Sequence, residues 1–206
     1  VFVATAVEKG WGQGFFRPIG GAQSGRFIEA PRNMQQQLRE AERSIENENY
    51  SDAVVRLGDL LQRDARSIDD SELNGQDFFL DASDAVENKK RFTESLFRRA
   101  RNMVGELPSK ARKMYQLRYG ALARKMLDDA AASRDWRVVA EVRRKYFHTD
   151  AGYDASLLLA KREFFAGHPL AASLLLDDIV TVPAAMSRLG ESVKLFYAAA
   201  CQISGR

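Results

Sequence analysis

The hydrophobic pattern is clearest in residues 151–182, where apolar side chains return at the three- and four-residue spacing of a helix face. Gly167-His168-Pro169 interrupts the pattern, and a second apolar face begins at Leu170. Two amphipathic runs joined by a tight Gly/Pro turn predict an antiparallel helical hairpin. One hairpin cannot bury its apolar face alone, so the pattern also predicts neighbouring hairpins that stack against it.

Six further stretches have the same helical spacing of apolar residues, and together with the hairpin they predict an all-α fold. Two of them are separated by Asn47-Glu48-Asn49, a short polar link that is typical of antiparallel helix pairs. Gly120 lies inside the longest stretch and marks a break or a close contact. The six stretches cover residues 34–46, 50–63, 92–105, 109–132, 135–146 and 192–203.

Three of the predicted helices begin in a similar way, at residues 48–53, 134–139 and 167–172. Each begins with a polar or Gly turn and a ring residue, followed three positions later by a small or branched apolar residue. This arrangement resembles the second half of a tetratricopeptide repeat, although the first-helix signature Trp-x-x-Leu-Gly is absent. Pro183 alone stands where a repeat-closing proline is expected. We therefore predict a tetratricopeptide-like helical-hairpin solenoid of degenerate repeats over residues 34–206.

Two segments lack the helical pattern. Residues 1–33 combine frequent Gly with aromatic residues and few cations, which predicts an irregular Gly/aromatic arm. Residues 66–90 are acidic and contain one apolar run, Phe78-Phe79-Leu80. Their spacing lacks the alternation and the terminal Glu of a calcium-binding loop. We therefore predict a solvated acidic insertion with one aromatic anchor inside the helical-repeat domain.

Composition and charge narrow the classes of function. The 206 residues contain 31 Lys+Arg and 28 Asp+Glu, and a formal net charge of +3 is too mild to require a polyanionic partner. No apolar run reaches the roughly 18 residues of a transmembrane helix. Cys201 is the single cysteine, which excludes an intrachain disulfide and a zinc site built from several cysteines.

Residues suited to catalysis are few. His148 and His168 are the only imidazoles, and both fall in predicted helix-to-helix turns, where turn-capping or surface roles are expected. The chain has no Gly-x-Ser-x-Gly, phosphate-binding Gly loop or His-Glu-x-x-His motif. Gly10-x-Gly12-x-Gly14 lacks the strand–turn–helix context of a nucleotide site. We therefore predict no enzymatic activity, no catalytic residue, no cofactor and no metal.

Cations outnumber acids in residues 98–145 and supply a candidate basic interaction face. Such a face could attract RNA, DNA or acidic lipid. However, Asp128, Asp129 and Glu141 are interleaved, as on ordinary solvated helix faces, which makes nucleic-acid binding an unfavoured expectation. The acidic insertion could instead lie against this face. The predicted face consists of Arg112, Lys113, Arg118, Arg124, Lys125, Arg143, Arg144 and Lys145.

Three runs carry a resemblance to a known family: Glu106-Leu107-Pro108, YQLRYGALA at 115–123 and RKYFHTDAGYDA at 144–155. They resemble the N-terminal helical region of large planctomycete-type proteins, in which a tetratricopeptide-like array precedes a quinoprotein-like (PQQ-like) β-propeller. The resemblance covers roughly residues 34–206 and is strongest over 107–176. It implies an exported, envelope-associated protein. This chain contains no propeller sequence, so no quinone-binding residue can be carried over.

These observations predict a non-catalytic protein–protein interaction or scaffolding module of a larger protein. Its partner would be a protein or peptide, including a propeller domain of the same polypeptide. Two alternatives stay open: a helical accessory region of a quinoprotein-like enzyme, and a basic-face binder of nucleic acid or anionic lipid. The resemblance and the small-x-small run Ala4-Thr5-Ala6 predict a periplasmic or cell-envelope location, with a cytoplasmic location as the alternative.

Overall fold

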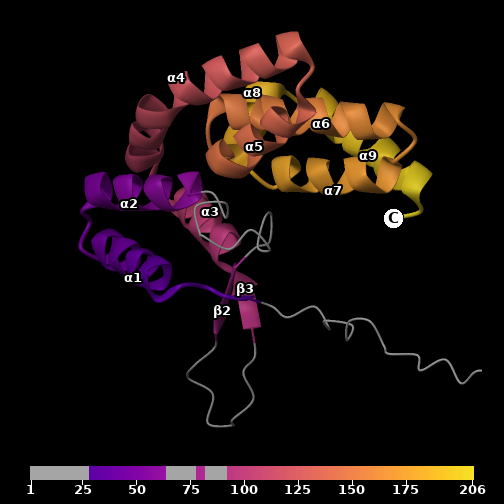
Figure 1. Ribbon diagram of the computed structural model, residues 1–206. Helices are drawn as coiled ribbons and strands as arrows, with labels where there is room; N and C mark the ends of the chain where they lie inside the picture. Colours follow the sequence, from indigo (N-terminus) through magenta and orange to yellow (C-terminus); the bar gives the residue numbers. More distant parts are fainter. Residues whose placement is uncertain (1–27, 64–77, 82–91) are drawn as a thin grey trace, which may run out of the picture.

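The computed structural model describes residues 28–63, 78–81 and 92–206, and helices dominate these ranges (Figure 1). The predicted all-α character is therefore confirmed. Three short strands, β1 (Ile28–Glu29), β2 (Phe78–Asp81) and β3 (Phe92–Ser95), form one small sheet. The helices are α1 (Arg32–Glu46), α2 (Tyr50–Gln62), α3 (Leu96–Glu106), α4 (Ser109–Ser133), α5 (Trp136–Tyr146), α6 (Asp150–Phe165), α7 (Pro169–Val180), α8 (Pro183–Leu189) and α9 (Ser192–Ser204).

Local side-chain chemistry explains where many of these helices begin. Pro169 and Pro183 start α7 and α8, at a position where the missing N–H has no intrahelical partner in any case. Gly167 turns the chain between α6 and α7 with a φ of 85°, so the predicted hairpin is confirmed. Four other helices are capped by a side chain that accepts a hydrogen bond from a first-turn N–H: Asn49 for α2, Ser95 for α3, Asp135 for α5 and Thr149 for α6.

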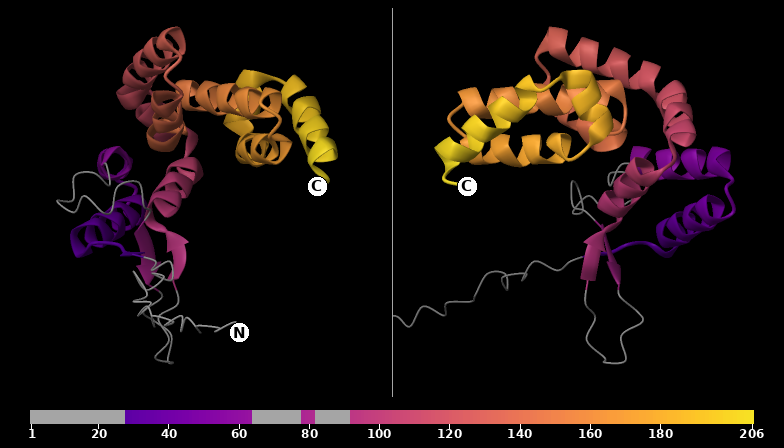
Figure 2. Two further views of the ribbon diagram at one scale, coloured as in Figure 1. Left: turned by 45° about the vertical axis from the view of Figure 1, so that its right-hand side comes forward. Right: turned by 180° about the vertical axis from the view of Figure 1, so that it is seen from behind.

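Most helices pack on the next helix along the chain (Figure 1 and Figure 2). α1 lies against α2, and α2 also contacts α3, α4 and α5. From α4 to α7 each helix packs on its successor, and α7 then packs on α9. The short α8 contacts α6, α7 and α9. In all three views α4 runs along the outer edge of the molecule.

Two apolar clusters form the core, and α6 contributes to both of them. The larger cluster extends from α1 to α6 and has Tyr115 of α4 fully buried within it. The Tyr115 hydroxyl donates a hydrogen bond to the Lys145 carbonyl at 3.2 Å, which satisfies the polar end of a buried ring. The smaller cluster joins α6 to α9 and includes Tyr153 and Leu176. Because α6 lies between the clusters, its position determines how the two halves meet.

The small sheet was not predicted by the sequence pattern. β1 pairs with β2 in parallel, and β2 pairs with β3 antiparallel, with Phe79 opposite Ser95. The helix predicted from Phe92 therefore begins at Leu96, because Ser95 caps it and the preceding aromatic and β-branched residue types favour a strand. Phe78 is buried, and its ring centroid lies 6.2 Å from that of Phe97, so Phe78 anchors β2 to the start of α3. The rest of the predicted insertion at 66–90 lies outside the described residues.

The described end of the predicted arm at 1–33 has regular secondary structure, where an irregular segment was expected. β1 and the start of α1 occupy its last residues, and residues 1–27 lie outside the described ranges. α8 was also not predicted, because seven residues are too few to show a helical period. Among the described helices, none alone is long and apolar enough to span a membrane. α7 and α8 meet that test only as a pair, which is bent by 106°.

Candidate functional site

A hollow of about 330 Å³ lies where α3, the start of α4, the α5–α6 corner and the α7–α8 link meet. Its walls come from three stretches that are far apart in the sequence, 98–112, 147–148 and 178–183. Convergence of this kind, with a few polar groups among apolar ones, is typical of a binding site. We call it the arginine hollow, and it is lined by Arg98, Arg101, Asn102, Gly105, Glu106, Arg112, Phe147, His148, Asp178, Thr181, Val182 and Pro183.

A second hollow, of about 450 Å³, lies between α1 and α2. Arg56 lines it and pairs with Glu40 and, at 2.7 Å, with Asp52. Gln37 donates a hydrogen bond from Nε2 to the Arg56 carbonyl at 3.1 Å. The cation of this hollow is therefore already held by two carboxylates, and its charged side chains are more exposed than Arg101 of the arginine hollow. The arginine hollow is the stronger candidate for ligand binding.

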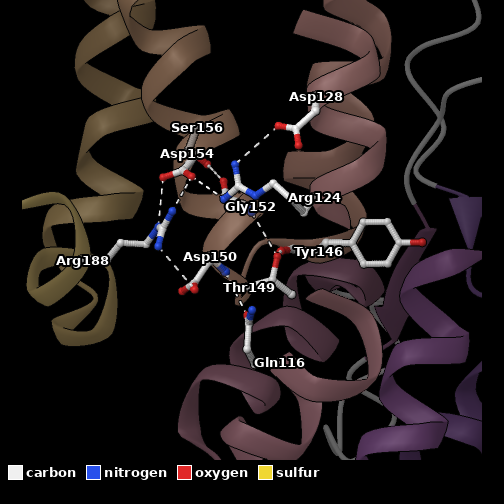
Figure 3. Close-up of polar contacts among 10 residues, drawn as sticks. All are labelled: Gln116, Arg124, Asp128, Tyr146, Thr149, Asp150, Gly152, Asp154, Ser156 and Arg188. Atoms are coloured by element: carbon white, nitrogen blue, oxygen red, sulfur yellow. Dashed lines mark hydrogen bonds and ion pairs between the residues drawn. The ribbon is translucent and has the colours of Figure 1, made fainter. Parts of the chain in front are cut away.

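The corner between α5 and α6 presents Phe147 and His148 to the arginine hollow, and backbone contacts fix its shape (Figure 3). Thr149 donates a hydrogen bond from Oγ1 to the Tyr146 carbonyl at 2.7 Å and accepts one from the Gly152 N–H at 3.1 Å. A Cβ atom at Gly152 would lie 2.0 Å from the Tyr146 carbonyl oxygen. Only glycine allows the first turn of α6 to approach the end of α5 so closely.

A polar network then holds α6 against α4 and α8 (Figure 3). Gln116 of α4 accepts a hydrogen bond at Oε1 from the Asp150 N–H at 3.0 Å. Asp154 of α6 lies between Arg124 Nη2 at 2.5 Å and Arg188 Nη2 at 2.7 Å. Partial burial opposes ionisation, but hydrogen bonds from Arg188 and Arg124 hold the pKa of Asp154 below its usual value. These contacts orient the corner that forms one wall of the arginine hollow.

We expect Asp154→Asn to lower the free energy of unfolding by about 1 kcal/mol, because the ion pairs are partly exposed and screened. Urea titration of the variant beside the wild type measures this difference. Asp129→Asn is the matched control, since Asp129 is exposed on the same α4 that supplies Arg124. Equal destabilisation by the two substitutions would contradict a role for the network.

His148 is half-buried at the edge of the arginine hollow. Its Nδ1 lies 3.4 Å from the Tyr153 hydroxyl oxygen, and the two rings meet edge-on with centroids 6.3 Å apart. Burial, together with the positive charges of Arg101 and Arg112, lowers the pKa of His148 to about 4. The imidazole is therefore neutral at pH 7 and adds no charge to the hollow.

The predicted helix-to-helix turn position of His148 is confirmed, but its ring is half-buried and does not cap a helix. Thr149 caps α6 instead, and the His148 ring packs against the backbone of α3 at Gly105, where a Cβ would lie 2.7 Å from the imidazole Cε1. His168 does have the predicted surface position. Its side chain is 63% exposed, and its Nδ1 lies 3.0 Å from Glu163. The two imidazoles thus have separate surroundings, one half-buried and one exposed.

Two arginines share one carboxylate at the wall of the hollow. Arg101 Nη1 lies 3.3 Å from Asp178 Oδ2, and Arg143 pairs with the same oxygen. Arg101 also lies 4.7 Å above the Phe147 ring, a cation–π geometry. Burial lowers the pKa of Arg143, and its buried Nε has no hydrogen-bond partner in the described part of the chain. One carboxylate cannot neutralise two guanidinium groups, so this wall stays positive.

Arg98 and Arg112 add further positive charge to the hollow. Neither forms an ion pair with a carboxylate of the described residues, and both face the hollow. With Arg101 they make three guanidinium groups that line the hollow, against the two carboxylates of Glu106 and Asp178, which leaves a net charge of +1. Guanidinium groups bind carboxylate or phosphate through paired N–H donors. The arrangement is therefore suited to an anionic ligand.

The structure does not bring the predicted basic face together as one surface. Only Arg112 lines the arginine hollow, while Lys145 is buried and its Nζ lies 2.5 Å from Glu141. The other members have different neighbours: Arg124 pairs with Asp154, Arg143 pairs with Asp178, Arg118 lies over the Tyr119 ring, Arg144 lies over the Phe97 ring, and Lys113 and Lys125 are exposed on α4.

Arg98, Arg101 and Asp178 were missing from the predicted face. The three-residue spacing of Arg98 and Arg101 places them on one face of α3, which is the signal that the sequence offered. Asp178 could not be found in this way, because it reaches the site from α7, some 77 positions after Arg101. Within the described residues, no group of three or more His, Cys, Asp or Glu side chains is arranged to hold a metal ion.

Comparisons with known proteins identified no relative of this chain. No family model matches the chain, no curated protein matches it, and no solved structure matches it. The resemblance to planctomycete-type propeller proteins therefore stays a prediction from the three sequence runs.

Proposed function

We propose that this protein is a non-catalytic interaction module whose helix pairs stack as a tetratricopeptide-like array. The array is supported by the order of packing, in which most helices contact their successors along the chain. It is also supported by the repeated entry into second helices, where Tyr50, Trp136 and Pro169 follow a turn. The short α8 and the 25-residue α4 depart from a regular repeat, as expected for degenerate units.

The partner of this module is an acidic segment of a protein, bound in the arginine hollow. The single observation that carries this proposal is the surplus of guanidinium groups there, with Arg98 and Arg112 unpaired among the described residues. A volume of about 330 Å³ accommodates one or two side chains rather than a folded domain. Glu or Asp side chains presented by an extended peptide match that size and charge.

The propeller alternative concerns where the acidic segment comes from. If the resemblance is correct, the segment belongs to a propeller domain of the same polypeptide, and the module is envelope-associated. An accessory role in a quinoprotein-like enzyme rests on the same resemblance and gains no separate support from the residues of the hollow. The chemistry of the arginine hollow is the same in either case.

Arg98→Ala combined with Arg112→Ala is expected to weaken binding of a fluorescent acidic peptide by at least about tenfold, because each charged hydrogen bond contributes about 1.5–3 kcal/mol. Fluorescence anisotropy measures the affinity, and crosslinking in a native extract tests whether the physiological partner carries an acidic segment. The matched control is Arg39→Ala with Arg43→Ala, two exposed arginines of α1. Equal weakening by both pairs, or no binding at all, would contradict the proposal.

A further inference from the structure

The first part of α4 carries an unusual distribution of charge. Residues 109–127 contain six cations and no Asp or Glu. Arg112 lines the arginine hollow and Arg124 pairs with Asp154, so these two are directed towards the body of the protein. The other four are exposed: Lys110, Lys113, Arg118 and Lys125. A helix with an acid-free cationic face differs from the mixed charge of an ordinary solvated helix.

Large apolar side chains lie among these exposed cations. Leu117 is 82% exposed and Leu122 is 48% exposed. The opposite face of α4 is buried through Ala111, Tyr115 and Ala123, so leucines and cations share the outward half of the helix. We call this outward half the α4 ridge, formed by Lys110, Lys113, Leu117, Arg118, Leu122 and Lys125.

The α4 ridge lies where a flat surface can reach it. In all three views α4 forms the outer edge of the described molecule, and α2, α5 and α6 contact its other side (Figure 1 and Figure 2). Residues 110–125 follow roughly 24 Å of helix path, and α4 bends along this edge in Figure 1 and Figure 2. An outward edge with an exposed leucine near its middle suits a surface that apolar side chains can enter, such as that of a lipid bilayer.

We infer that the α4 ridge docks on the surface of a membrane that contains anionic lipid. The cations would meet the headgroups, and Leu117 would enter the boundary between headgroups and acyl chains, as in interfacial amphipathic helices. A nucleic acid explains the cations but gives no place to Leu117. An acidic protein surface could accept both, and it becomes an outcome of the test. This surface is separate from the arginine hollow, so the inference does not depend on the proposed function.

The test is co-sedimentation of the full chain with vesicles of phosphatidylcholine alone or mixed with phosphatidylglycerol, at low and high salt. Binding is expected only with the anionic vesicles, and salt should weaken it. Lys113→Glu with Lys125→Glu should weaken binding by at least ~25-fold, since each cation near an anionic surface contributes a factor of about five. Leu117→Ser should weaken it about tenfold, through the apolar area that can no longer be buried.

Matched controls separate this face from general charge and general hydrophobicity. Lys161→Glu with Lys194→Glu makes the same change in net charge on α6 and α9, and Leu195→Ser removes a leucine that is 75% exposed on α9. Both controls should bind vesicles like the wild type. All of the substituted positions are exposed, and circular dichroism spectra verify that each variant is folded.

Several results would overturn the inference. They are absence of binding to anionic vesicles, equal binding to phosphatidylcholine alone, and equal loss in the α4 and control variants. Binding of an acidic polypeptide that depends on Leu117, without vesicle binding, would assign the ridge to a protein partner instead. Salt-sensitive binding of duplex DNA that is unchanged by Leu117→Ser would assign it to nucleic acid.

Discussion

Replacing Gly152 by alanine is expected to lower the free energy of unfolding by about 3 kcal/mol or more. The new Cβ would lie 2.0 Å from the Tyr146 carbonyl oxygen and 2.6 Å from the Phe147 carbonyl oxygen. Both atoms belong to the backbone and cannot rotate away, so α5 and α6 must separate. Separation also breaks the Thr149 hydrogen bonds and opens the contact between the two apolar clusters. Steric overpacking of this kind is among the larger effects of a single substitution.

Gly120→Ala is the matched control for this prediction. Gly120 also lies inside a helix, but a Cβ there would meet Gln116 Nε2 at 2.4 Å, the end of a flexible side chain. The side chain can move at the cost of its hydrogen bond to the Asp150 N–H, while alanine gains about 1 kcal/mol of helix propensity. We expect a small net change in urea titrations. If both variants lose the same stability, the close approach at Gly152 is not the cause.

The helical part of this fold could be predicted from sequence because each helix has a local signal. Apolar spacing placed the helices, and Asn49 and Asp135 precede two of them as caps that sequence alone can identify. The strands were not predicted, because two to four residues are too few to show the alternation of apolar and polar residues that marks a strand. β1 and β2 also pair across a sequence gap of about fifty residues, and periodicity carries no information on such contacts.

The candidate site was predicted less well than the fold, for a related reason. Counting cations between 98 and 145 treats every arginine alike, but the partner of each arginine depends on which helix faces it. Arg143 and Arg124 are paired with carboxylates from α7 and α6, whereas Arg98 keeps its charge free of the described carboxylates. The partial burial of His148 depends in the same way on how the turn between α5 and α6 meets Gly105 of α3. Electrostatic surfaces are therefore set by tertiary packing, which local patterns do not contain.

A second large effect is expected when pH falls below neutrality. The pKa of His148 is about 4 in the folded protein, against about 6.5 in an unfolded chain. Between these values the unfolded state binds a proton that the folded state does not bind. The contribution of neutral His148 to stability is therefore complete above pH 6.5 and is lost as pH falls towards 4. The linkage between proton binding and folding lowers the free energy of unfolding by about 2 kcal/mol at pH 5 and by about 3 kcal/mol at pH 4, relative to neutral pH.

Urea titrations at pH 7 and pH 5 measure this loss, and two variants identify its source. His148→Gln should abolish most of the loss, because glutamine does not titrate, whatever its effect on stability at pH 7. His168→Gln should keep the wild-type loss, since His168 is largely exposed beside Glu163. Arg101 and Arg112 are the charges that face His148 from α3 and α4. An anion bound in the arginine hollow would offset them and raise the pKa of His148, so a saturating acidic peptide should reduce the loss at pH 5. A loss that is unchanged in His148→Gln would show that other groups, and not the imidazole of His148, make the fold sensitive to acid.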